Sequence, residues 1–438
     1  MKARSKVADP GFRKYFLNTG WLFAEKFLRL IAAVFVSAYV ARYLGPGQYG
    51  LLIYAISLVG LLTGISFLGL DDILQREIVK EPRKTNTIMG SAFVMRLISA
   101  GIIYGGFAIA VQSEQTDPVT RKLILIIGLG MVLQAFGIIQ YFFQAKVWSK
   151  YTVTSQIIAL VVVSIFRVVL VLNEAPLVWF AWSQTLDYGI LAIGLVGYFS
   201  RNVSSPFKWK FDFSVASGLL KTSWPLIFSS LAITLYMRFD QVMVKWMLGN
   251  VAAGHYGVAV RLSEMWNFIP VAVCSSLFPA LINSRGTSLK LYMDRLQNLY
   301  DLIVGMALSI AIAMTFLSGP IVNLLFGEEF APGANILSLY IWSGVFTFMG
   351  VANGKWIILE DLQKFRMYCL VIAGVMNVAL TYVFVKLMGL DGAAVATLVS
   401  YAFANYLSLL IIPKGRKTFI MLTRSLNPFR LITRLRRL

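Results

Sequence analysis

Apolar stretches of about 20 residues recur along the chain and are separated by short polar connectors. Each stretch is long enough to cross the hydrocarbon core of a bilayer as an α-helix. A transmembrane β-barrel would instead show alternating segments of about ten residues. The pattern therefore predicts an all-α polytopic membrane protein with about twelve spans, at residues 17–41, 49–70, 87–112, 122–143, 153–172, 177–199, 223–248, 255–282, 299–318, 334–359, 367–387 and 392–412.

The composition agrees with this pattern. Hydrophobic residues make up 58% of the chain and charged residues 14%, whereas soluble proteins carry about 25% charged residues. The connectors are too short to hold an extramembrane catalytic domain, so we expect a protein that is not an enzyme. A membrane enzyme such as a polymerase or an acyltransferase would need a large outer loop with clustered catalytic groups, and the outer loops here are short and nearly uncharged.

The charges outside the spans predict the orientation. Of the 40 lysines and arginines, 28 lie in segments that share one side of the membrane, and four lie in or beside the connectors on the other side. The positive-inside rule then places both termini in the cytoplasm. The net charge of +20 is explained by this bias and by interaction with anionic lipids, so no nucleic-acid partner is expected.

A weak internal repeat predicts the domain organisation. The connectors Leu44-Gly45-Pro46-Gly47-Gln48-Tyr49-Gly50 and Leu248 to Gly257 both read Leu-Gly, a short turn, then Tyr-Gly. Six spans precede the cytoplasmic stretch 200–222 and six follow it, and transporters with two repeated halves bind their cargo between the halves. We therefore expect four parts: a six-helix lobe at 1–199, a cytoplasmic linker at 200–222, a second six-helix lobe at 223–412 and a basic tail at 413–438.

The tail is predicted to be an amphipathic helix on the cytoplasmic membrane surface. Arg430, Arg434 and Arg437 share one helical face, and leucines occupy the neighbouring face. Such a segment binds anionic lipid. A disordered basic tail is the alternative.

Eight cationic side chains lie inside the predicted spans, accompanied by four acids. A lysine or arginine at membrane depth costs several kcal/mol unless it faces protein or water, which makes such a residue a candidate for a functional site. The excess of cations predicts a water-filled, positively charged cleft for an anionic cargo. The cations are Lys26, Arg29, Arg96, Arg167, Arg238, Lys245, Arg261 and Lys355, and the acids are Glu25, Asp187, Asp240 and Glu264.

Helical phase ranks these residues. Glu25 and Arg29 share a face of the first span, Arg238 and Lys245 share a face of the seventh, and Arg261 lies in the eighth. Arg29, Arg238 and Arg261 are therefore the strongest candidates for binding the cargo, with Lys26 and Lys245 at the margin of the same cleft. The alternative is that Glu25 with Arg29, and Arg261 with Glu264, are structural ion pairs, and for Arg96, Arg167 and Lys355 a structural role is equally plausible.

Other chemistry is sparse. The two cysteines, Cys274 and Cys369, and the single histidine, His255, give no metal-ligand pattern, so neither a metal nor a cofactor is expected. The acids Asp187, Asp240 and Glu264 at membrane depth make coupling to H⁺ or Na⁺ a hypothesis. Polar residues that could contact sugars, or equally join helices to one another, are Gln134, Gln140, Tyr141, Gln144, Gln184, Tyr188 and Asn267.

Motifs along almost the whole chain resemble bacterial polysaccharide-biosynthesis flippases of the Wzx type. They include Ala41-Arg42-Tyr43-Leu44-Gly45-Pro46, Leu68-Gly69-Leu70-Asp71, Trp224-Pro225, Arg238-Phe239-Asp240, Ser276-Leu277-Phe278-Pro279, Leu325-Phe326-Gly327-Glu328-Glu329-Phe330 and Gly389-Leu390-Asp391-Gly392. This resemblance implies a member of the MATE-like multidrug/oligosaccharidyl-lipid/polysaccharide superfamily, with two six-helix lobes around a central cationic cleft.

The resemblance also implies a cargo. Such proteins move an undecaprenyl-pyrophosphate-linked oligosaccharide from the cytoplasmic to the outer leaflet of the bacterial inner membrane, for O-antigen and lipopolysaccharide or another surface polysaccharide, and a polysaccharide polymerase is an expected partner. Relatives that flip the peptidoglycan precursor use cations of the first and eighth helices, where Arg29 and Arg261 lie in this chain. Arginines can replace the hydration of a pyrophosphate with bidentate hydrogen bonds. A cation-coupled multidrug exporter on the same fold is the alternative, although cationic drugs favour an acidic cleft.

Overall fold

The computed structural model describes residues 10–113 and 117–427; the side chains of residues 10–24 and of a few further helix positions lie outside this description. The expected tail face of Arg430, Arg434 and Arg437 therefore lies outside the described residues. Within the described ranges all regular structure is helical, which confirms the all-α prediction.

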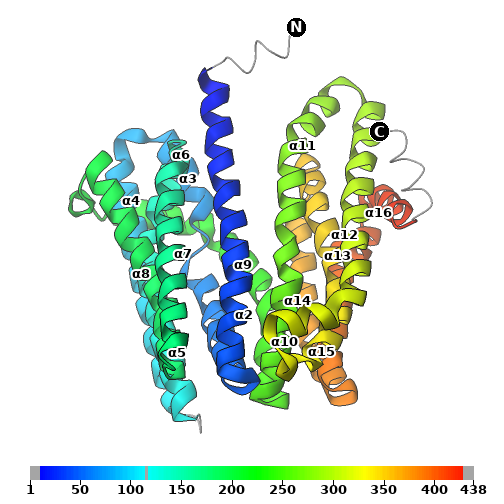
Figure 1. The fold of residues 1–438 in the computed structure, drawn as a ribbon. Coiled ribbons are helices and arrows are strands. Elements are labelled where there is room, and N and C mark those ends of the chain that lie inside the picture. The colour runs from blue at the N-terminus through cyan, green and yellow to red at the C-terminus, as the bar shows by residue number, and fades with distance from the viewer. Residues whose placement is uncertain (1–9, 114–116, 428–438) are drawn as a thin grey trace. The chain divides into compact units, whose positions relative to one another are not determined.

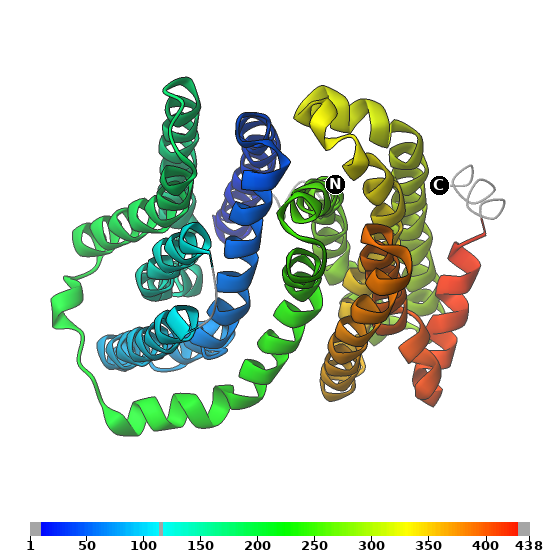
Figure 2. The ribbon, with the colours of Figure 1, turned by 90° about the horizontal axis from the view of Figure 1, so that it is seen from below.

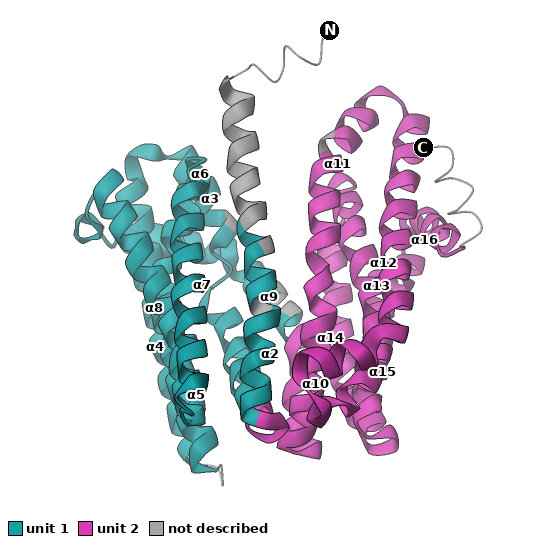
Figure 3. Ribbon diagram, in the orientation of Figure 1, with its two compact units in different colours: residues 1–44, 51–234 teal, residues 45–50, 235–438 magenta. Residues whose placement is uncertain are grey.

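The chain forms two compact units (Figures 1 and 3). Unit 1 comprises residues 1–44 and 51–234, and unit 2 comprises residues 45–50 and 235–438. The chain therefore passes from one unit to the other within α2, back again six residues later, and finally within α9.

Unit 1 consists mainly of long helices. They are α2 (Pro10–Ser66), α3 (Asp71–Lys80), α4 (Thr85–Ser113), α5 (Pro118–Leu133), α6 (Ile138–Ala145), α7 (Ser149–Leu172), α8 (Leu177–Asn202) and the first part of α9 (Phe213–Leu248), with 3-10 turns η1 (Pro82–Lys84), η2 (Gln134–Gly137) and η3 (Pro206–Lys208). α5 packs against both α4 and α8, and α8 also packs against α7.

Unit 2 is built around α13 (Pro332–Leu359), which packs against α10 (Asn250–Glu264), α11 (Phe268–Thr287), α12 (Leu289–Phe326) and α15 (Leu390–Asn405). α14 (Gln363–Met388) packs against α15, and α16 (Pro413–Ser425) against α12. Short 3-10 turns complete the unit: η4 (Met265–Asn267), η5 (Glu328–Phe330) and η6 (Leu407–Ile411).

The helices agree with a multi-pass membrane protein. In the described part of the chain, eight helices are long and apolar enough to cross a membrane, or nine if the bent pair at 250–287 is one span. All twelve predicted ranges lie largely in helix. One apolar helical segment, residues 28–66, extends over parts of two of those ranges. Gly45 (φ 66°, ψ 169°) has non-helical dihedrals and divides this segment into two helices.

The two repeated connectors break their helices at the same place and then cross. Gly45 has φ 66° and Gly249 has φ 88°, a region that favours glycine. Five residues later, a Cβ atom on Gly50 would collide with the carbonyl oxygen of Asn250, and a Cβ on Gly254 would collide with that of Pro46. This reciprocal contact lies within unit 2. It places Gly254 in the position of Gly50, so the structural repeat reads Leu-Gly-x-x-x-x-Gly and its register differs from the Tyr-Gly match seen in the sequence.

The segment between α8 and α9 is fixed to unit 1. The Trp209 ring lies 5.5 Å from that of Phe93 and 5.6 Å from that of Phe199. The Ser91 hydroxyl donates to the Asp212 carbonyl (3.2 Å) and lies 3.1 Å from the Asp212 amide nitrogen. α9 then begins at Phe213, so the last ten residues of the stretch that the sequence predicts as a linker, 213–222, are helical.

Candidate functional site

In unit 1, Arg29 of α2 lies between two carboxylates. Its Nε lies 2.6 Å from Oε1 of Glu25, one helical turn earlier, and its NH1 nitrogen lies 4.0 Å from Oδ2 of Asp187 on α8. Glu25 is buried, while the Arg29 side chain keeps 37% of its accessible surface. Lys26, on the next position of α2, is exposed. The structure thus brings Glu25, Arg29 and Asp187 together. Lys26 takes no part in these two ion pairs.

The geometry leaves hydrogen-bonding capacity on Arg29. A guanidinium has five N–H donors, and charge-assisted N–H···O bonds are about 2.7–2.9 Å long. The 2.6 Å contact with Glu25 is at least as short as such a bond, whereas the 4.0 Å separation from Asp187 is an electrostatic contact only. An anion can therefore approach the half-exposed guanidinium without displacing Glu25.

In unit 2, Arg238 of α9 and Glu264 of α10 form a loose ion pair. Their closest atoms, the NH2 nitrogen and Oε2, are 3.7 Å apart, and the Arg238 side chain is 40% exposed. Glu264 therefore pairs with a residue on the neighbouring helix, although the sequence drew attention to Arg261, three residues away on its own helix. Arg261 and Lys245 are both partly exposed.

Asp240, two residues after Arg238, has a different environment. It is 1% exposed, and none of the ion pairs among the described residues includes it. Its carboxyl group accepts hydrogen bonds from the Tyr256 hydroxyl (2.6 Å) and the Gln241 amide (2.7 Å), and the Thr397 hydroxyl lies 3.1 Å away. Asp240 thus joins α9, α10 and α15 through buried hydrogen bonds.

Three further cations predicted inside the spans contact neighbouring side chains. Arg96, 2% exposed, is paired with Asp71 at the start of α3, and its guanidinium lies over the rings of Phe67 (5.0 Å) and Tyr141 (5.4 Å).

Arg167 and Lys355 also contact side chains of neighbouring helices, Arg167 through hydrogen bonds and Lys355 through an aromatic ring. Arg167 donates to Ser183 (2.9 Å) and to Gln184 (3.1 Å) on α8. Lys355 lies 4.9 Å from the centre of the Phe278 ring. These contacts fit a structural role, in which the cation fastens one helix to another.

Several of the polar residues considered for sugars also connect helices. Gln144 is hydrogen-bonded to Gln75, and Gln184 contacts both Arg167 and Tyr188. Tyr141 is engaged with Arg96. Hydrogen bonds of this kind hold membrane helices together.

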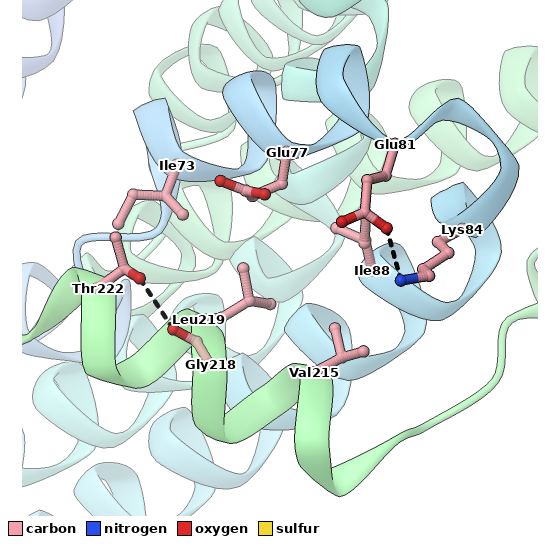
Figure 4. Close-up of a pocket in the computed structure, with 9 residues that line it drawn as sticks. All are labelled: Ile73, Glu77, Glu81, Lys84, Ile88, Val215, Gly218, Leu219 and Thr222. Atoms are coloured by element: carbon pink, nitrogen blue, oxygen red, sulfur yellow. Dashed lines mark hydrogen bonds and ion pairs between the residues drawn. The ribbon is translucent and has the colours of Figure 1, made fainter.

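The short helix α3 and the cavity beside it were not anticipated from the sequence. A cavity of about 270 Å³ lies between α3, the start of α4 and the first part of α9 (Figure 4). The acids at this place are already neutralised, because Glu81 pairs with Lys84 (2.6 Å) and Glu77 with Arg76 (2.8 Å). The only sequence signal for α3 is a pattern of charged and apolar residues over ten positions, which is too short to be distinguished from a polar connector. The cavity is lined by Ile73, Glu77, Glu81, Lys84, Ile88, Val215, Gly218, Leu219 and Thr222.

The described residues contain no group of three or more His, Cys, Asp and Glu side chains that could hold a metal ion. Cys274 and Cys369 are buried free thiols.

Comparison with known proteins identifies the family. Residues 16–284 match the family of polysaccharide biosynthesis proteins, which is more than half of the chain. The protein belongs to this family. The resemblance drawn from the sequence motifs is thereby confirmed.

Relatives of this polysaccharide biosynthesis protein include a lipid II flippase and a probable flippase. It is 26% identical over 192 residues to the lipid II flippase MurJ of Bacillus subtilis, a match that covers 40% of this chain and 35% of MurJ. It is 24% identical over 243 residues to the probable flippase AglR of Haloferax volcanii, covering 52% of this chain and 48% of AglR. The matches thus span between a third and a half of the length of these relatives.

Solved structures show the same fold. A lipid II flippase MurJ in an inward closed conformation has a TM-score of 0.69 at 17% identity, covering 94% of this chain and 92% of that structure. An inward-facing MATE family multidrug transporter of the MOP superfamily has a TM-score of 0.65 at 12% identity, covering 93% and 96%. This family member is therefore a multi-pass membrane protein with the MATE-like fold.

Proposed function

We propose that the protein is a flippase for a lipid-linked glycan. It moves undecaprenyl-pyrophosphate-linked oligosaccharide repeat units from the cytoplasmic to the outer leaflet of the bacterial inner membrane by alternating access, for O-antigen or another surface polysaccharide. Membership in the polysaccharide biosynthesis family supports this proposal, as does similarity to a lipid II flippase, a probable flippase and a probable low-salt glycan biosynthesis flippase.

The observation that carries this proposal is the exposure of two arginines within predicted membrane spans. Arg29 and Arg238 lie in helices predicted to span the membrane, yet their side chains are 37% and 40% exposed. An arginine at that depth is stable only against water or protein, and a partly exposed guanidinium, which keeps N–H donors available, suits a pyrophosphate. We assign the pyrophosphate to Arg29, Arg238 and Arg261, with Lys26 and Lys245 at the margin.

The acids give these arginines a resting partner. The separations of 4.0 Å from Asp187 and 3.7 Å from Glu264 exceed the length of a charge-assisted hydrogen bond. An arriving phosphate oxygen can therefore form the shorter and stronger bond while the carboxylate stays nearby. After release of the lipid, the acid again balances the charge of the empty site.

We further propose that Asp240 is the residue through which H⁺ or Na⁺ is coupled to transport. It is a buried carboxyl group without an ion pair among the described residues, and it connects three helices. In this proposal both termini are cytoplasmic, as the distribution of lysines and arginines favours, and a polysaccharide polymerase receives the flipped product.

The test is complementation of a strain that lacks the gene and has no redundant flippase. Lipid-linked repeat units should accumulate in the cytoplasmic leaflet and return to normal with the wild-type gene. Arg29→Ala, Arg238→Ala and Arg261→Ala should each fail to complement at normal protein levels. Arg285→Ala is the matched control, because Arg285 is equally exposed (42%) and paired with Glu360 at 3.3 Å but lies outside the apolar part of its span.

Two results would overturn the proposal. One is normal glycan export in the deletion strain. The other is an unchanged glycan together with increased sensitivity to cationic drugs, which would favour the multidrug exporter. Transport that is insensitive to collapse of both the H⁺ and the Na⁺ gradient would remove the coupling role of Asp240 only.

A further inference from the structure

A row of exposed apolar side chains follows the segment that connects α8 to α9. Phe207 is 99% exposed and Phe213 is 78% exposed. Both side chains precede the seventh predicted span, which begins at residue 223, so exposure to the hydrocarbon core does not account for them; of the set named next, only Trp224 lies within that span, at its start. We call the following set the aromatic strip: Phe207, Phe211, Phe213, Leu220 and Trp224.

The strip is held in place from behind. Trp209 packs between Phe93 and Phe199, and Ser91 bonds to the backbone of Asp212. The amide of Lys210 also donates to the carbonyl of Asn86 (3.3 Å). Phe207 and Phe211 are therefore exposed on a segment whose backbone is fixed, and their exposure is not a result of a loose loop.

Within α9 the exposed and buried faces are distinct. At 100° per residue, Phe213, Leu220 and Trp224 fall within about 40° of one another. The buried residues Ala216, Leu219 and Ser223 form a second stripe about 90° away. The first turns of α9 run across the view of Figure 2, in which several long helices of unit 1 are seen nearly end-on. The strip thus lies along a helical segment that runs beside these neighbours at a steep angle to their axes.

Cations accompany the strip. Residues 201–224 contain four basic residues and a single acid, Asp212, whose Oδ1 accepts from the Val215 amide (3.0 Å) and caps α9. The basic residues are all exposed: Arg201, Lys208, Lys210 and Lys221. Aromatic and apolar side chains interleaved with lysines are typical of segments that lie in the membrane interface, where the rings enter the head-group region and the lysines meet anionic lipids.

We propose that the aromatic strip is a membrane-docking surface that holds the first turns of α9 in the head-group region of the leaflet on that side, with Lys208, Lys210 and Lys221 bound to anionic lipid phosphates. The partner is the lipid surface itself. The inference goes beyond the transport function and does not depend on which cargo is carried, because it rests on residues outside the proposed pyrophosphate site.

Spin labels on the full-length protein in vesicles test the apolar part. In a Cys274→Ser, Cys369→Ser background, labels are placed by Phe207→Cys, Phe213→Cys and Trp224→Cys, with Ser214→Cys as the control. Ser214 is exposed and lies about 100° around the helix from Phe213. The three strip labels should collide more with oxygen and less with a water-soluble nickel chelate than the control label. Equal nickel accessibility at all four positions would overturn the proposal and leave a soluble protein partner as the occupant.

Vesicle composition tests the electrostatic part. The same labels are compared in phosphatidylcholine alone and in phosphatidylcholine with 30% phosphatidylglycerol. The anionic lipid should lower nickel accessibility at the strip, since each basic residue near an anionic surface contributes about a fivefold factor in partitioning. The triple variant Lys208→Gln, Lys210→Gln, Lys221→Gln should lose this dependence, whereas Lys290→Gln, an exposed lysine in unit 2, should keep it. A triple variant that responds to the anionic lipid like the parent would refute the role of the lysines.

Discussion

Replacing Tyr256 by phenylalanine removes one hydroxyl from the buried Asp240 cluster. The Tyr256 side chain is completely buried, and its hydroxyl lies 2.6 Å from Oδ2 of Asp240. The substitution removes only the oxygen and keeps the ring, so the edge-on contact with Tyr340 at 5.8 Å remains. Any change in stability therefore reports on the contacts of the Tyr256 hydroxyl, which are the short bond to Asp240 and a longer one, of 3.3 Å, to the Thr397 hydroxyl.

The size of the effect depends on the charge of Asp240. Hydrogen bonds to charged groups contribute about 1.5–3 kcal/mol, whereas those measured between membrane helices average about 0.6 kcal/mol. An ionised carboxylate only accepts, and Asp240 accepts from Tyr256 and from the Gln241 amide with a further hydroxyl at 3.1 Å. We therefore expect Tyr256→Phe to destabilise unit 2 by about 2 kcal/mol.

Tyr292→Phe is the matched control. Tyr292 is also buried in unit 2, at 1% exposure, but its hydroxyl has no hydrogen-bond partner among the described residues. Removing an unsatisfied buried hydroxyl should leave stability unchanged or raise it by up to about 1 kcal/mol. The assay is unfolding of the purified protein by SDS in mixed micelles, followed by tryptophan fluorescence. Equal losses for the two variants would refute the reasoning, and a loss near 0.6 kcal/mol for Tyr256→Phe would show that the bond to Asp240 contributes no more than an average hydrogen bond between membrane helices.

Three further outcomes follow from the packing. Gly50→Ala should prevent folding or strongly lower the thermal stability, because the added Cβ would meet backbone atoms. Gly60→Ala is the control: nothing lies within 4 Å of its Cβ, so the higher helix propensity of alanine should stabilise the protein by about 1 kcal/mol. Thermal unfolding in detergent would show whether the two variants differ. Arg96→Ala should cost about 3 kcal/mol in the same assay, at the lower end for a broken buried pair because its carboxylate partner is 41% exposed, and a loss below 1 kcal/mol would contradict this. Trp209→Ala should speed cleavage by trypsin after Lys210 by releasing the segment from unit 1, and an unchanged cleavage rate would show that the ring does not fix it.

The sequence was sufficient for the fold class and the family because both depend on features that repeat along the chain. Long apolar stretches specify helices, and glycines such as Gly45 and Gly249 mark the positions where those helices are interrupted. The register of the repeat was missed, because only the close approach of Gly50 and Gly254 reveals which glycines correspond. Tyr-Gly pairs look alike in sequence whether or not a backbone crosses them.

The ion pairs were predictable only along one helix. Glu25 and Arg29 are one turn apart, and the structure pairs them. The pairing of Arg238 with Glu264 joins residues 26 positions apart on different helices, so spacing carried no information about it. The same holds for Asp240 and Thr397, which meet only because α9 and α15 pack together. Whether these residues bind cargo stays a prediction.

The assignment of residues 45–50 to unit 2 has a consequence for dissecting the protein. A cut in the segment between α8 and α9 would leave a first fragment that carries one short piece of unit 2, and a second fragment that carries residues 213–234 of unit 1. Neither fragment would be a complete folding unit. The first would lack residues 213–234 of unit 1, and the second would lack residues 45–50 of unit 2. Coexpressed fragments should therefore copurify, while either one expressed alone should fail to fold.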